Sequence, residues 1–121
     1  MAKTKERRNN QSNVSSFRKL IDLKEECIGR GAIFRMIGEW PYEDVVDFML
    51  FDTLDQERTL GFITATGYKA GLQCVHLPNE CLFQNTRMLS TKWIIKNWKK
   101  WVYPQCSIED IYYIQNYPTP S

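Results

Sequence analysis

Residues 45–66, VVDFMLFDTLDQERTLGFITAT, carry the strongest fold signal in the chain. Residues 45–51 are nearly all apolar, which is typical of a central strand covered on both faces, although a buried helix of this length has the same pattern. Residues 53–58 are polar and turn-like, and residues 59–66 are rich in β-branched and aromatic side chains. The stretch therefore predicts an antiparallel β-hairpin.

Further strand signals lie on either side of this hairpin. Residues 32–37, 72–77 and 108–117 are each rich in β-type side chains and predict three more strands. Strict alternation in residues 72–77 predicts that Cys74 and His76 share one face of their strand.

Two segments have helical spacing. Residues 17–28 place apolar side chains near a period of 3.6 and precede Gly29, a stop signal. Residues 90–103 begin with a capping Ser or Thr and place Ile94 and Trp98 on one face. Strands in the middle and helices at either side predict an α+β fold. We expect a mainly antiparallel sheet packed with an N-terminal helix and a Trp-rich helix in the C-terminal half.

The charge is unevenly distributed. Residues 1–19 carry a net charge of +5, whereas the whole chain carries +2, so residues 20–121 are acidic at −3. Residues 1–16 have too few apolar side chains to offset the entropy of ordering. We therefore expect a disordered basic tail over residues 1–16 and one α+β domain over residues 17–121.

The compartment follows from two absences in the sequence. There is no apolar run of about 18 residues that would span a bilayer, and no N-terminal secretory signal. We expect a cytoplasmic protein without membrane contact and with reduced thiols, while the even number of cysteines leaves disulfides formally open. The cysteines are Cys27, Cys74, Cys81 and Cys106.

Seven carboxylates lie between Glu39 and Glu57, and Arg58 is the nearest cation in sequence. They favour a negatively charged face that attracts a cationic partner, and a solvated surface without a partner is the alternative. A role as catalytic acid and base is disfavoured because no apolar pocket is indicated that would raise a pKa. The predicted contact residues, with two aromatic anchors first, are Trp40, Tyr42, Glu43, Asp44, Asp47, Asp52, Asp55 and Glu57.

Enzyme signatures are weak. Cys74 and His76 could form a thiol–imidazole pair or part of a zinc site, but the sequence indicates neither an orienting third group nor four ligands at paired spacings. Phosphate-binding glycine loops and the nucleophile-elbow pattern are absent from the sequence. We expect a protein that is not an enzyme, with no cofactor and no metal.

Three segments carry a resemblance: GAIFRMIGEWPYEDVVDFMLFD, LGFITATGYKAGL and STKWIIKNWKKWVYP. In these the chain resembles small bacterial immunity proteins of polymorphic toxin and contact-dependent growth inhibition systems. The resemblance implies a cytoplasmic, non-catalytic protein that binds the C-terminal domain of one cognate toxin, often a nuclease, and protects the producer and its kin. It implies no particular binding residues, because such interfaces vary from pair to pair.

We therefore predict an immunity protein that neutralises a toxin by occluding its active site or its substrate binding, without direct nucleic-acid binding. A nuclease must be basic to hold phosphates, so acidic side chains on the inhibitor would be complementary. The alternative is a nucleic-acid-binding accessory protein that uses the basic tail and the lysines of residues 90–103, namely Lys92, Lys96, Lys99 and Lys100.

Overall fold

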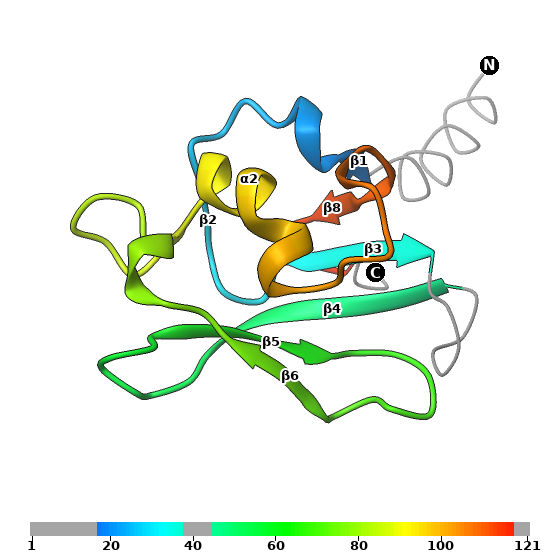
Figure 1. Cartoon of the computed structure of the whole chain (residues 1–121), viewed down its shortest axis with the longest axis horizontal. Helices are drawn as coiled ribbons and strands as arrows, with labels where there is room; N and C mark the ends of the chain where they lie inside the picture. The colour runs from blue at the N-terminus through cyan, green and yellow to red at the C-terminus, as the bar shows by residue number, and fades with distance from the viewer. Residues whose placement is uncertain (1–16, 38–44, 118–121) are drawn as a thin grey trace, which may run out of the picture.

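The computed structural model describes residues 17–37 and 45–117. These residues form a six-stranded sheet in the order β1-β8-β3-β4-β5-β6, with every neighbouring pair antiparallel, and a separate antiparallel pair, β2-β7 (Figure 1). The strands are β1 (Arg18–Lys19), β2 (Cys27–Ile28), β3 (Ile33–Ile37), β4 (Val45–Asp52), β5 (Leu60–Thr64), β6 (Gln73–His76), β7 (Leu89–Ser90) and β8 (Tyr112–Ile114). The helices are the α-helix α2 (Thr91–Trp101) and the 3-10 turns η1 (Leu20–Asp22), η2 (Asn79–Cys81) and η3 (Ile108–Asp110).

The predicted hairpin is confirmed by β4 and β5. The two strands pair in register from Phe48 opposite Thr64 to Asp52 opposite Leu60. Val46, Phe48 and Leu50 alternate onto the core face of β4 and are buried. The helical alternative for this apolar run is thereby excluded.

The predicted C-terminal-half helix is also confirmed, as α2. The Ser90 hydroxyl caps it by accepting a hydrogen bond from the Trp93 amide at 3.2 Å. At the other end, the amides of Val102 and Tyr103 both donate to the Trp98 carbonyl, which closes the last turn. Among the described residues, no helix is long and apolar enough to cross a bilayer.

The core lies between α2 and one face of the sheet (Figure 1). Trp98 of α2 is fully buried, and its ring centroid lies 5.6 Å from that of Phe34, 5.7 Å from Phe62 and 6.4 Å from Phe48. Three neighbouring strands thus pack against one helical side chain, as expected for the predicted α+β class.

The predicted N-terminal helix over residues 17–28 is wrong. The segment instead forms β1, η1 and β2, with Leu20 buried. Its backbone groups bond to distant parts of the chain: the Leu20 amide donates to the Ile111 carbonyl, and the Glu26 carbonyl accepts from the Thr91 amide. These long-range hydrogen bonds replace the local ones that helical spacing alone would favour.

Two predicted strands are shorter or less regular than expected. Residues 108–117 open with η3 and contain a three-residue strand, β8. In β6 a register shift opposite Phe62 and Ile63 breaks the alternation, and the side chains of Gln73 and His76 hydrogen-bond to each other at 2.8 Å. A bulge accounts for this because it changes which side chains share a face.

Candidate functional site

The hairpin loop, defined as residues 52–59 between β4 and β5, presents an unusual leucine. Leu54 is 87% exposed, and its backbone lies in the left-handed region at φ +67°. That conformation costs a residue with a Cβ atom roughly 1–2 kcal/mol. The surrounding structure has to hold the backbone of such a residue in this conformation. Residues with strained backbones are common at binding sites.

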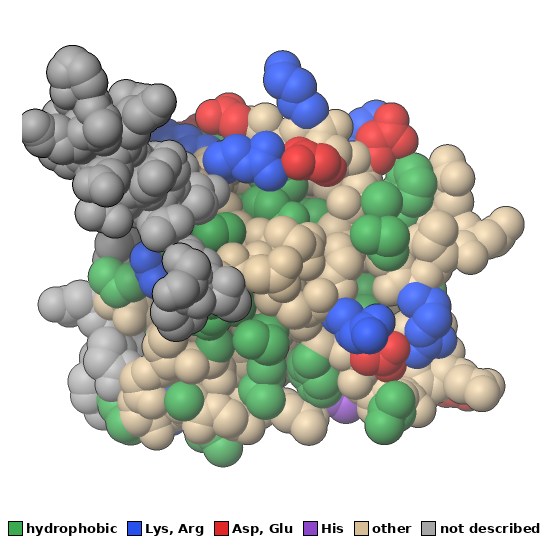
Figure 2. Space-filling model, turned by 180° about the vertical axis from the view of Figure 1, so that it is seen from behind, with side chains coloured by type: hydrophobic (Ala, Val, Ile, Leu, Met, Phe, Trp, Pro, Cys, Tyr) green, Lys and Arg blue, Asp and Glu red, His purple; other side chains and the backbone are tan. Residues whose placement is uncertain are grey.

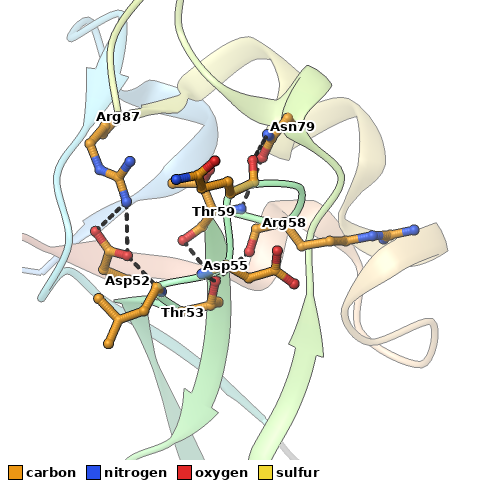
Figure 3. A network of polar contacts seen from close by, with 9 residues as sticks. Asp52, Thr53, Asp55, Arg58, Thr59, Asn79 and Arg87 are labelled. Carbon is orange, nitrogen blue, oxygen red and sulfur yellow. Dashed lines mark hydrogen bonds and ion pairs between the residues drawn. The ribbon is translucent and has the colours of Figure 1, made fainter.

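Hydrogen bonds inside the hairpin loop supply this restraint (Figure 3). The Leu54 amide donates to Asp52 Oδ1 (2.9 Å), the Asp55 amide to Thr53 Oγ1 (3.0 Å), the Glu57 amide to Asp55 Oδ1 (2.9 Å), the Thr53 amide to the Thr59 carbonyl (2.9 Å), and the Thr53 hydroxyl to the Arg58 carbonyl. Short Asp and Thr side chains commonly replace backbone partners in this way within turns. The loop is therefore ordered by its own sequence.

Two side chains from outside the loop fix it to the body of the protein. Asn79 bridges it from η2, because its Oδ1 accepts from the Thr59 amide at 2.9 Å and its Nδ2 donates to the Gln56 carbonyl at 2.7 Å. On the other side, Arg87 Nη2 forms an ion pair with the Asp52 carboxylate at 2.8 Å (Figure 3). Leu54 thus extends from a loop that is anchored on both flanks.

Two charged residues of the hairpin loop, Asp52 and Arg58, have different partners. The hydrogen bond from Arg87 holds the pKa of Asp52 below its usual value, and the Leu54 amide adds to this effect. Arg58 points away from the pair, since its guanidinium lies 5.4 Å from the ring centroid of Trp101 and its Nη1 donates to the His76 carbonyl. Asp52 is therefore compensated within the chain.

Those predicted contact residues that the structure describes do not form one surface. Asp55 and Glu57 lie exposed on the hairpin loop, and the Asp52 side chain is 23% exposed beside them. Asp47 is only 1% exposed: Arg35 donates to it from Nε at 2.8 Å and from Nη2 at 3.0 Å. Its carboxylate is therefore buried and paired within the sheet. The remaining predicted residues, Trp40, Tyr42, Glu43 and Asp44, lie outside the described residues.

The expected field of one sign is not found among the described acids. Arg35 faces Asp47 across paired strands, and Arg87 reaches Asp52 from 35 positions further along the chain. Figure 2 likewise shows acidic side chains gathered beside basic ones on the face that it displays. Sequence proximity suggested Arg58 as the nearby cation, whereas folding places Arg35 beside Asp47 and Arg87 beside Asp52.

Leu54 was missed by the sequence reasoning. Its signal was a single large apolar residue between Thr53 and Asp55, inside a turn whose neighbours are all residues that hydrogen-bond their own backbone. A leucine there cannot join either strand of the hairpin. It is therefore a candidate for an exposed contact residue.

The thiol–imidazole pair is not formed. Cys74 Sγ lies 3.1 Å from Thr64 Oγ1, and His76 Nε2 bonds to Gln73 Oε1 instead. Burial raises the pKa of the Cys74 thiol, which disfavours the thiolate that a nucleophile requires. Within residues 17–37 and 45–117, no group of three His, Cys, Asp or Glu side chains is placed to hold a metal ion.

The comparisons with known proteins bear on most of the described chain. Residues 20–113 match the family model described as Immunity protein 45, a segment that includes the hairpin loop, α2 and nearly all of the sheet. Neither the curated proteins nor the solved structures gave a match.

Proposed function

The chain belongs to the Immunity protein 45 family, and from this membership we propose that it binds and neutralises the C-terminal domain of one cognate bacterial toxin. The toxin would belong to a polymorphic or contact-dependent inhibition system, and the complex would form in the cytoplasm of the producing cell. The protein would act by occupying a surface of the toxin, with no bond made or broken.

We place the contact with the toxin at the hairpin loop because of the conformation of Leu54. Leu54 is held in one backbone conformation before any partner arrives, so binding would cost little ordering entropy there. Residues that dominate an interface lie in well-packed pockets of the other protein from which water is excluded. We assign Leu54 the role of anchor in a pocket of the toxin.

Asp55 and Glu57 would form the acidic rim of this contact. Both are exposed beside Leu54. Rim charges act chiefly on the rate of association, because they steer the encounter more than they hold the complex. A toxin that cleaves nucleic acid needs cationic side chains for the phosphates, so we propose a nuclease whose active site or substrate path is covered by the hairpin loop.

The test begins with the toxin domain encoded by the adjacent upstream open reading frame. We expect it to co-purify with the full chain and to lose its toxic activity in the complex. Leu54→Asn introduces a residue that tolerates the left-handed backbone and removes the apolar anchor, so it should weaken the complex by at least about tenfold. Thermal unfolding should remain close to that of the unmodified protein.

Leu72→Asn is the matched control. Leu72 is 57% exposed and lies at the opposite end of β5 from the hairpin loop, where its carbonyl accepts from the Thr64 amide. The same chemical change there should leave toxin binding unchanged. Equal losses for both variants, or none for Leu54→Asn, would remove the hairpin loop from the contact; a wild-type chain that forms no complex would refute the toxin-binding function.

A second candidate function has one observation in its favour. The lysines of α2 are exposed, and none of the three ion pairs between described residues involves them. Such a face would bind a polyanion through counterion release. Gel-shift titration at two salt concentrations separates the functions, because the immunity function predicts little RNA or DNA affinity at physiological salt. The residues concerned are Lys92, Lys96, Lys99 and Lys100.

A further inference from the structure

A groove runs beside the hairpin loop. Two adjoining hollows of about 350 and 380 Å³ share Arg30 and Asp52 as lining residues. Arg87 lies in the first hollow, and Met49 and Phe51 of β4 line the second. The groove therefore combines charged side chains with apolar walls.

The charges in this groove do not balance. Among the described residues that line it, the charged ones are two arginines, Arg30 and Arg87, and one carboxylate, Asp52. Arg30 is exposed and takes part in none of the three ion pairs between described residues. Both hydrogen bonds from Arg87 to Asp52 leave from Nη2, and its side chain is 61% exposed. Arg30 is near enough to help lower the pKa of Asp52, after the larger effect of Arg87. One positive charge remains for a ligand.

The groove and the anchor are linked through one residue, Asp52. Asp52 lines both hollows, accepts the ion pair from Arg87 and accepts the hydrogen bond from the Leu54 amide (Figure 3). Asp52 therefore links the two arginine-lined hollows to the backbone of the anchor residue. Covering the groove would remove water from the arginines and strengthen their attraction for an anion.

We propose that the Arg30–Arg87 groove receives an aspartate or glutamate side chain of the toxin, placed beside the pocket that takes Leu54. This inference rests on the proposed function and adds the chemistry of the partner surface: an apolar socket with a carboxylate at its edge. Arginine suits this role because its planar guanidinium presents paired donors to a carboxylate. The hairpin loop would then meet the toxin with an acidic rim on one side and a cationic groove on the other.

The experiment measures association and dissociation rates of the full chain with the toxin domain from the adjacent reading frame. Arg30→Glu should lower the affinity at least about tenfold at low salt, since it replaces attraction by repulsion. Lys24→Glu is the control, because Lys24 is exposed between η1 and β2 and does not line the groove. It carries the same charge change and should leave the affinity within about twofold.

A charge swap identifies the occupant. Among single Asp→Arg and Glu→Arg variants of the toxin, at least one should bind Arg30→Glu more tightly than it binds the unmodified chain. If Arg30→Glu bound the unmodified toxin as tightly as the unmodified chain does, the groove proposal would be wrong and the toxin-binding function would remain supported. If the unmodified chain formed no complex with the toxin, both proposals would be wrong. Binding of a labelled oligonucleotide that is lost in Arg30→Glu, with toxin affinity unchanged, would make the groove a phosphate site and refute the proposal.

Discussion

The hydroxyl of Tyr117 donates a 2.6 Å hydrogen bond to Oδ2 of Asp47, seventy residues earlier in the chain. Asp47 lies in β4, near the middle of the sheet, and its side chain is on the face away from α2. Arg35 of the neighbouring strand β3 lies directly opposite it. The same arginine lies 4.2 Å from the ring centroid of Phe17. One buried carboxylate thereby fixes residues near both ends of the described chain to the sheet.

Tyr117→Phe tests the contribution of this hydrogen bond. The variant keeps the aromatic ring and removes the hydroxyl donor. The Asp47 carboxylate then keeps Arg35 as its partner, and the Asp47 amide still donates to the Thr66 hydroxyl. We expect the free energy of unfolding in urea to fall by about 1.5–3 kcal/mol, the range for a hydrogen bond to a charged group. Tyr112→Phe is the control, because Tyr112 is 39% exposed and bonds through its hydroxyl to no described residue. An equal loss in both variants would assign the effect to the aromatic ring environment instead.

Removing only the arginine of the Arg35–Asp47 ion pair should cost more stability than removing both partners. Arg35→Met leaves the 1% exposed carboxylate of Asp47 without its cation, so we expect a loss of about 3 kcal/mol. Arg35→Met combined with Asp47→Val removes the buried charge as well and should recover at least about half of that loss. Urea unfolding of the single and double variants measures both values. A double variant no more stable than Arg35→Met would show that packing, and not the stranded charge, sets the cost.

Asp47 also shows where sequence reasoning ends. The apolar run around it predicted the strand correctly, because periodicity is a local property. Its carboxylate was assigned to an exposed face because the partners that bury it, Arg35 and Tyr117, come from β3 and from beyond β8. Pairing of strands distant in sequence decides this outcome, and one sequence contains no direct record of that pairing.

The helix prediction for residues 17–28 was wrong for a related reason. Helical spacing in residues 17–28 satisfied a local rule, yet Arg18 and Lys19 complete the sheet beside β8, and Cys27 pairs with Ser90. By contrast, α2 was predictable because its cap, its apolar face and its stop signal all agree. Within the candidate site, the turn was predicted at residues 53–58, but the exposure of Leu54 depends on its hydrogen-bond network.

Asp52→Asn probes the loop through pH. Arg87 holds the pKa of folded Asp52 below its usual value, so the folded protein stays ionised while the unfolded chain takes up a proton. This stabilisation is present above about pH 4 and is lost as the pH falls through the lowered pKa of the folded state. Thermal melts should therefore show wild type above Asp52→Asn at neutral pH, with the gap closing under acid. A gap that persists unchanged at the lowest pH would show that the negative charge of Asp52 is not what stabilises the loop.

The cysteines should differ in reactivity. Cys81 is fully buried, and burial raises its pKa to about 12. Cys74 is exposed, though its pKa is also raised by partial burial of the thiol. At pH 8 a thiol reagent should modify Cys74 before Cys81, which should react only on unfolding. Peptide mass spectrometry after timed quenching measures the order; early modification of Cys81 in the folded protein would mean that the core opens locally.

Gly61→Ala should be severely destabilising. A Cβ atom at Gly61 would lie 2.5 Å from the Val75 carbonyl oxygen and 3.0 Å from the Phe51 ring. The carbonyl belongs to the paired strand β6, so relief requires β5 and β6 to separate, and we expect a loss of about 2–3 kcal/mol in urea unfolding. Gly29→Ala is the matched control, because its Cβ would meet Met88 at an ordinary 3.5 Å. If Gly61→Ala unfolded at the same urea concentration as Gly29→Ala, the close approach of these two strands would be wrong.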